Sequence, residues 1–140
     1  MSDLNSMELV IDAKSQNEKF ARSVVGAFFA QLNPTLEQID DVKTAVSEAV
    51  TNCIVHAYSG AQEGKIHISC QLSTDTLFVE IVDFGKGIED VTKAMEPFYT
   101  TVSSGERSGM GFTVMQAFCD TVSVQSDKGK TSVKLTKKIA

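Results

Sequence analysis

The stretch Ser47-Glu48-Ala49-Val50-Thr51-Asn52-Cys53-Ile54-Val55-His56 predicts a helix with one buried and one polar side. At 3.6 residues per turn, Glu48, Asn52 and His56 stand one turn apart and form a polar stripe. Apolar residues occupy the opposite side: Val46, Ala49, Val50 and Cys53. Such a stripe is typical of any solvent-facing helix surface, but a carboxylate and a carboxamide in adjacent turns can also act on one ligand.

Length and composition describe an ordinary globular protein. The 140 residues fit a single domain, 1–140, with 42% hydrophobic and 22% charged residues. A net charge of −5 argues against nucleic acid as the main partner, because a phosphate backbone favours a basic surface. The three widely spaced cysteines predict reduced thiols. The sequence has no apolar run of about 20 residues, and its polar start does not resemble a signal peptide, so we expect no membrane contact and a cytoplasmic location.

The first part of the chain predicts one strand and two helices. Alternation over Met7–Ala13 predicts a half-buried strand, placed at a sheet edge because it comes first. Ser15–Glu18 has a capping-box pattern, and a second one at Thr35–Gln38 opens a helix that runs to about His56. Asn33-Pro34 separates the two helices. The residues expected on the buried side of the first helix repeat every four positions: Phe20, Val24, Phe28 and Leu32.

The second part predicts two hairpins with a glycine-rich region between them. Alternating residues 66–72 and 77–81 form the first hairpin, whose second strand ends at Asp83. A short helix over 89–95, a polar loop over 97–108 and a helix opened by Gly109–Gly111 follow. Strands 121–126 and 131–137 close the chain. This order indicates an α+β, two-layer α/β sandwich, with helices on one face of an antiparallel-rich mixed sheet.

Two glycine pairs and the acidic residue before the first pair suggest a nucleotide site. Asp83 can accept a hydrogen bond from a base amine, while Gly85 and Gly87 let a flat ring approach the backbone. The pair Gly109 and Gly111, at a helix start, can offer N–H groups to phosphate. The polar loop over 100–105 has the composition of a lid. Taken singly, these features also suit a tight turn, a helix start and a surface loop.

Two familiar phosphate motifs do not fit. Both glycine pairs lack the third glycine of the dinucleotide fingerprint, because Asp90 and Val114 occupy its position. Gly129-Lys130-Thr131 resembles the end of a P-loop, but it lies between two strands and is typical of a hairpin turn.

The order of Glu48-x-x-x-Asn52, Asp83-x-Gly85-x-Gly87, a lid and Gly109-x-Gly111 resembles the N, G1 and G2 boxes of the GHKL ATPase and kinase superfamily. This resemblance covers nearly the whole chain and implies the Bergerat-type ATP-binding sandwich. Residues 46–52 and the run Glu106–Met115 are similar to the bacterial anti-sigma factor serine kinases, most of all to the sporulation branch that acts on sigma-F. Members bind a sigma factor and phosphorylate a serine of an anti-anti-sigma protein of the STAS type.

Carried over by position, the resemblance implies that Asn52 coordinates Mg²⁺, Asp83 binds the adenine amine of ATP or ADP, and Glu48 receives or orients the acceptor serine's hydroxyl proton. Phosphoryl transfer of this kind depends on positioning and charge stabilisation around a metal ion. Further residues are implied at the nucleotide: Thr51, Gly85, Gly87, Arg107, Ser108, Gly109, Met110, Gly111 and Thr131.

Three positions need separate treatment. Arg22 matches an arginine that members use to contact protein partners, although a solvated helix face is the plain alternative. His56 either caps the helix end or lines the site. Family members usually have glycine directly before the threonine of the last hairpin, whereas Lys130 separates Gly129 from Thr131 here.

The sequence thus predicts a homodimeric anti-sigma factor and protein-serine kinase. A stress-response or switch-type kinase with other partners, and an anti-sigma module that binds ATP without transferring phosphate, are the alternatives. Glu48 favours the kinase, because binding alone would not need it. Sensor histidine kinases would need a phosphoacceptor segment before the ATP domain, and gyrase-like or chaperone-like ATPases would need further domains.

Overall fold

The computed structural model describes residues 4–57, 64–85, 111–127 and 129–140. The described part holds three α-helices and five strands, with two short helical extensions. The elements follow in this order: β1 (Asn5–Asp12), α1 (Gln16–Phe29), the 3-10 turn η1 (Ala30–Leu32), α2 (Leu36–Asn52), the π-helical turn η2 (Cys53–Ala57), β2 (Lys65–Leu72), β3 (Thr76–Asp83), α4 (Gly111–Phe118), β4 (Thr121–Asp127) and β5 (Lys130–Lys138). The short helix predicted over 89–95 and the lid predicted over 100–105 lie outside the described residues.

The five strands form one sheet in the order β1-β2-β3-β5-β4. All four pairings between the described strands are antiparallel. Strand β1 is an edge strand, as its place in the sequence predicted. Strand β5 lies between β3 and β4. The second strand of the closing hairpin, β5, therefore pairs with the second strand of the first hairpin, β3.

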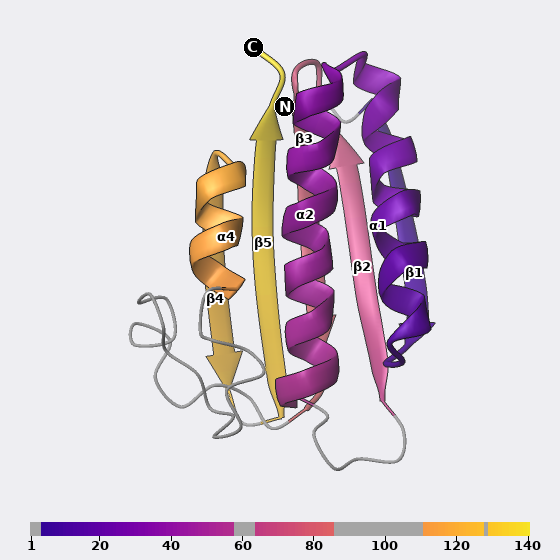
Figure 1. Cartoon of the computed structure of the whole chain (residues 1–140), viewed down its shortest axis with the longest axis vertical. Helices are drawn as coiled ribbons and strands as arrows, with labels where there is room; N and C mark the ends of the chain where they lie inside the picture. Colours follow the sequence, from indigo (N-terminus) through magenta and orange to yellow (C-terminus); the bar gives the residue numbers. More distant parts are fainter. Residues whose placement is uncertain (1–3, 58–63, 86–110, 128) are drawn as a thin grey trace.

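The helices α1, α2 and α4 lie side by side on one face of the sheet (Figure 1), which confirms the predicted two-layer architecture. The core lies between the layers, because alternate strand residues point toward the helices. Every inward position predicted for the first hairpin is buried: Ile66, Ile68, Cys70, Leu72, Leu77, Val79 and Ile81.

Helix α2 forms as predicted. Thr35 is its N-cap, and the Thr35 and Gln38 side chains bond reciprocally to each other's backbone N–H, at 3.1 and 2.8 Å. The helix continues through η2 to Ala57, and its last turn widens to a π-helix. The side chain of His56 lies outside what the structure describes.

Two expectations for α1 were wrong. Ser15 adopts the helical region, with φ −57° and ψ −34°, and makes no side-chain cap bond, because a capping box needs an extended N-cap. Phe20 is 53% exposed, since a repeat of four residues drifts about 40° per step on a helix of 3.6 residues per turn. The residues that α1 buries are Ala21, Val25, Gly26, Phe28 and Phe29.

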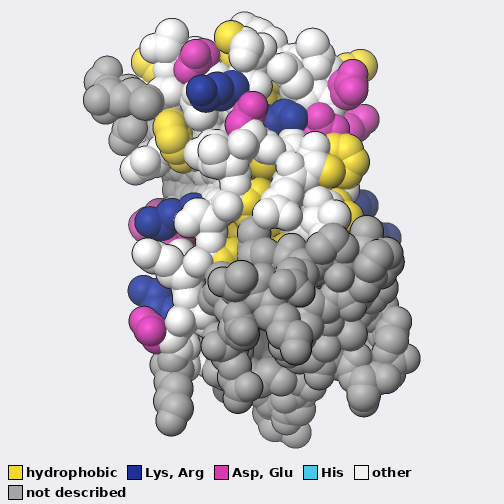
Figure 2. All heavy atoms as spheres, turned by 90° about the vertical axis from the view of Figure 1, so that its left-hand side faces the viewer, with side chains coloured by type: hydrophobic (Ala, Val, Ile, Leu, Met, Phe, Trp, Pro, Cys, Tyr) yellow, Lys and Arg dark blue, Asp and Glu magenta, His cyan; other side chains and the backbone are white. Residues whose placement is uncertain are grey.

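The surface of the described part carries mixed charge on the side of α4 and β4. Figure 2, which views this side, shows basic and acidic side chains interspersed on the coloured surface. Among the described residues, no helix has the length and apolar character required to cross a membrane.

Candidate nucleotide site

Three element ends lie at the lower end of the molecule in Figure 1: the C-terminal end of the α2–η2 helix, the end of β3 and the start of β5. The N-terminal end of α4 lies higher, and its Gly111 is next to Asn52 of α2. These ends carry four of the residues that the sequence assigned to a nucleotide site: Asn52, Gly111, Asp83 and Thr131. Tertiary packing therefore brings together residues from both glycine-containing segments and from the helical stripe.

Asn52 and Gly111 are in direct contact between α2 and α4. A Cβ atom added to Gly111 would lie 2.9 Å from Asn52 Nδ2 and 3.1 Å from Asn52 Oδ1. Any side chain at position 111 would thus crowd the carboxamide of Asn52. Glycine here lets the start of α4 approach the amide group of Asn52, for which the family resemblance implies metal binding.

Asp83 is a buried carboxylate at the end of β3, with only 4% of its surface exposed. The Gly85 backbone N–H donates to Asp83 Oδ1 at 3.1 Å. Burial raises the pKa of Asp83, and the Gly85 N–H and the nearby Cys53 thiol oppose that rise. Burial and the neighbouring carboxylate raise the pKa of Cys53 well above its usual range, so the thiol keeps its proton. The Asp83 carboxylate, hydrogen-bonded to Gly85, can offer a hydrogen-bond acceptor to a ligand.

Thr131 lies beside Asp83, because the two residues are partners in the β3–β5 ladder. It is 5% exposed, and its hydroxyl shares a hydrogen bond of 2.8 Å with the Ser126 hydroxyl. Gly129 has φ 82°, a left-handed conformation that glycine adopts without strain. Although Lys130 separates Gly129 from Thr131, Thr131 still lies next to Asp83, the carboxylate predicted to bind the base.

Glu48 and Thr51 precede Asn52 on α2, and both are partly buried. The Thr51 hydroxyl donates to the Ser47 carbonyl one turn earlier, at 2.7 Å. Its proton is therefore used within the helix, and only the oxygen remains to accept from a ligand. Glu48 lies one turn before Asn52, on the same side of the helix.

Several predicted nucleotide contacts lie outside the described residues: Gly87, Arg107, Ser108, Gly109 and Met110. Arg22 is described and lies on α1, away from the α2–α4 contact, with α2 between them (Figure 1). Its guanidinium Nε is 3.5 Å from Glu18 Oε2, one turn earlier on the helix. Sequence reasoning placed Cys53 only in the core and missed that it lies near Asp83, because no local pattern relates two residues that far apart in the chain.

A magnesium ion suits the residues present. The described part holds no cluster of three or more His, Cys, Asp or Glu side chains arranged to bind a metal ion. Mg²⁺ usually keeps several waters and takes one or two protein oxygens together with substrate phosphates. The amide oxygen of Asn52, beside the bare backbone of Gly111, is a suitable single ligand of this kind.

Residues 11–137 match the family model described as the histidine kinase-like ATPase domain. The chain belongs to this family. The match implies ATP binding, and it includes α2, β3, α4 and β5, whose ends form the site.

Relatives named anti-sigma F factor align with almost the whole of this ATPase domain, which therefore also belongs to their family. The protein from Caldanaerobacter subterraneus subsp. tengcongensis is 57% identical over 136 residues, 96% of this chain and 94% of the relative. The protein from Thermoanaerobacter sp. (strain X514) is 56% identical over 140 residues, 99% of this chain and 97% of the relative.

Solved structures share the fold of this ATPase domain. The RsbU and RsbW domains of Rv1364c from Mycobacterium tuberculosis align with a TM-score of 0.71 at 18% identity, covering 96% of this chain and 32% of that chain. The catalytic domain of histidine kinase ThkA aligns with a TM-score of 0.60 at 14% identity, covering 94% of this chain and 98% of that chain.

Proposed function

We propose that this chain is an anti-sigma factor and protein-serine kinase. It binds and inhibits a sigma factor of the sigma-F class, and it uses Mg-ATP to phosphorylate a serine of a STAS-type anti-anti-sigma protein. The observation that carries the proposal is the identity of 56–57% to anti-sigma F factors over almost the full chain. The presence of Glu48 one turn before Asn52 supports a transfer reaction beyond nucleotide binding.

In the transfer reaction, each residue has a separate role. Asp83 accepts a hydrogen bond from the adenine amine, and the N–H group at Gly111 faces phosphate. Asn52 would hold Mg²⁺, which would supply charge neutralisation at the phosphates. Glu48 accepts the proton as the serine oxygen bonds to the γ-phosphorus and the bond to the β–γ bridging oxygen breaks, which releases ADP.

Phosphoserine formation tests the proposal. The protein is mixed with Mg-ATP and each candidate anti-anti-sigma protein, and phosphoserine is measured by mass spectrometry. Glu48→Gln should keep ATP affinity and lower the transfer rate about 10²-fold or more, the contribution expected of a general base.

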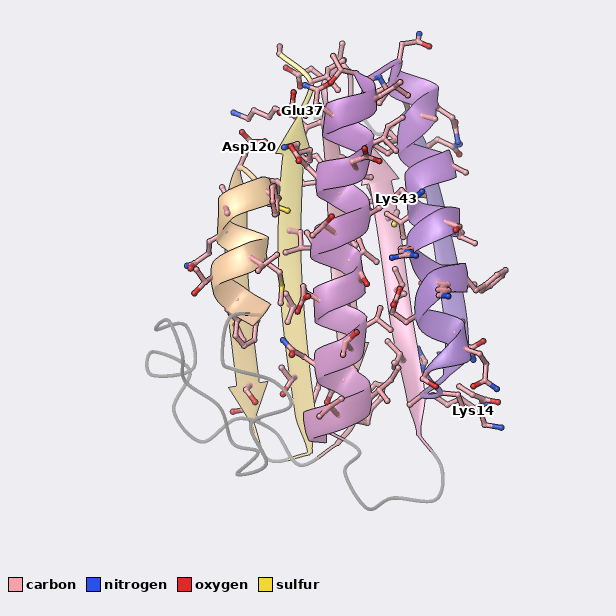
Figure 3. All side chains as sticks on the ribbon, in the orientation of Figure 1. Lys14, Glu37, Lys43 and Asp120 are labelled. Carbon is pink, nitrogen blue, oxygen red and sulfur yellow. The ribbon has the colours of Figure 1, made fainter. Side chains whose placement is uncertain are left out.

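Glu37→Gln is the matched control, because Glu37 lies in the first turn of α2, at the opposite end of that helix from Asn52 (Figure 3). It should transfer phosphate at the wild-type rate. Unchanged transfer in Glu48→Gln would remove Glu48 from catalysis. Sigma-factor binding without any phosphoserine would instead indicate a binding module that uses ATP as a ligand.

The proposal includes a homodimer. Strand β1 is an edge strand, so its outer backbone groups can pair with another copy of the chain. Light scattering after size-exclusion chromatography measures the mass directly, and a mass near the 15.1 kDa of one chain would contradict this part of the proposal.

A further inference from the structure

The aromatic rings of His67 and Phe84 are in contact on the face of the sheet opposite the helices. His67 lies on β2 between two buried residues, Ile66 and Ile68, so its exposed side chain points away from the helix layer. The ring centroids of His67 and Phe84 are 5.2 Å apart and the ring planes are inclined by 80°, an edge-to-face arrangement. This contact joins β2 to the residue that directly follows β3.

Phe84 controls the turn that holds the Asp83 carboxylate. Both ladders of β3 end at Asp83, which pairs with Ile66 on β2 and with Thr131 on β5, so Phe84 lies beyond the last ladder position. The Gly85 N–H donates to Asp83 Oδ1 at 3.1 Å, a turn in which an aspartate side chain accepts from the backbone two residues later. Because Phe84 stands between the acceptor and the donor residue, its backbone conformation decides whether this bond forms.

We propose that His67 is a positioning residue for base recognition: by holding the Phe84 ring, it fixes the turn that orients the Asp83 carboxylate toward the exocyclic amine of adenine. This inference rests on the proposed nucleotide site. The buried Asp83 side chain lies on the helix-covered face of the sheet, whereas His67 lies on the other face. His67 therefore does not touch the base; it acts through Phe84.

The physical basis is the order of the turn before the nucleotide binds. Beyond the last ladder pair, the sheet no longer fixes the backbone, so a side-chain contact there restricts the conformations of the turn. Removing the His67 ring releases Phe84 from β2, and part of the orientation of Asp83 must then be fixed when the base binds. That ordering lowers the affinity for the base.

The surroundings of His67 indicate that its ring acts through packing. Its cross-strand partners are Val10 on β1 and Val82 on β3, and neither side chain carries a polar group. Among the described residues, the contact with Phe84 is the one aromatic or polar interaction of the His67 side chain. Another aromatic ring at position 67 should therefore serve equally well.

The test compares two nucleotides that differ only at the group Asp83 recognises. Calorimetry measures binding of Mg-ATP and of Mg-purine riboside triphosphate, which lacks the exocyclic amine. His67→Ala should weaken Mg-ATP binding about two- to tenfold, the range of one aromatic pair, and leave binding of the purine analogue unchanged. His67→Phe keeps an aromatic ring and should restore the wild-type ratio of the two affinities.

A double-mutant cycle tests whether His67 acts through Phe84. Phe84→Ala should cause the same selective loss of Mg-ATP affinity. The variant with both substitutions should lose less affinity than the product of the two single losses, because both remove the same contact. Losses that multiply fully would overturn the proposed path through Phe84.

Gln71→Ala is the matched control, because Gln71 is an exposed residue on β2, four positions from His67 and on the same face of the sheet. It should leave the ratio of the two affinities unchanged. An equal loss for both nucleotides in His67→Ala, or no loss for Mg-ATP, would overturn the positioning role. Equal binding of the two nucleotides by the wild-type protein would instead contradict base recognition by Asp83 itself, so the two failures are distinguishable.

Discussion

At the residue scale, the contact between Gly111 and Asn52 leaves no free space for a side chain at position 111. The two residues come from different helices, and the absence of a Cβ at position 111 is what lets them meet. The fold can tolerate a small side chain there, because the group displaced is the mobile end of Asn52. We therefore expect the substitution to disturb the Asn52 amide, the group proposed to bind Mg²⁺, rather than the fold.

Gly111→Ala should accordingly preserve folding and reduce Mg-ATP affinity about tenfold or more, with little change in ATP binding when EDTA removes magnesium. Calorimetry with and without Mg²⁺ measures both. Gly26→Ala is a matched control, because its Cβ would meet the Lys43 side chain at a similar 3.0 Å, between α1 and α2 (Figure 3). Wild-type Mg-ATP affinity in Gly111→Ala would contradict the role of Asn52.

At the element scale, Lys137 joins three elements at the end of the molecule opposite the site. From β5, its ammonium group donates to Asp41 on α2 at 3.0 Å and to the Phe118 carbonyl, at the end of α4, at 2.6 Å. The two charged side chains are only 14% and 21% exposed. Nearby, Asp120 accepts from the Lys138 backbone N–H at 2.7 Å, which ties the start of β4 to the end of β5.

Lys137→Met keeps the side-chain length but removes both bonds, and it leaves a mostly buried carboxylate uncompensated. We expect it to lower the free energy of unfolding by about 2 kcal/mol, below the 3–5 kcal/mol of a fully buried pair. Urea denaturation measures the change. Lys134→Met, at an exposed position on the same strand, should change stability by less than about 0.5 kcal/mol. Equal effects of the two substitutions would show that the buried pair adds nothing specific.

At the scale of the whole molecule, the proposed partner-binding residue and the nucleotide site belong to different helices. Arg22 lies on α1, while Asn52 and Gly111 face each other between α2 and α4 (Figure 1). The Arg22 side chain is 37% exposed, and its ion pair with Glu18 is local to the helix. A partner can therefore contact Arg22 without entering the nucleotide site.

Arg22→Ala should weaken sigma-factor binding about tenfold or more in a pull-down or by surface plasmon resonance, and it should leave ATP affinity unchanged. Its effect on stability should be small, because an exposed helical ion pair contributes only about 0.3–0.5 kcal/mol. Lys19→Ala removes an exposed cation from the same helix and serves as control. Undiminished sigma-factor binding in Arg22→Ala would show that Arg22 is an ordinary solvent-facing residue with no role in partner binding.

Much of this protein could be predicted from local sequence patterns. The reciprocal cap at Thr35 and Gln38, the helix that carries Glu48 and Asn52, and the alternating strands of the first hairpin all formed as expected. Caps and periodicities are interactions between residues a few positions apart, so the sequence records them directly. The face buried by α1 was predicted wrongly, because four-residue spacing is only an approximation to the helical repeat.

By itself, then, the sequence determined the elements, the two-layer class and the polar stripe at the end of α2. Only the tertiary structure decided that β5 lies between β3 and β4, that Gly111 contacts Asn52, and that Thr131 lies beside Asp83. The physical reason is that these contacts join residues far apart in the chain. A local pattern specifies which way a side chain points, whereas its partner depends on how the layers pack.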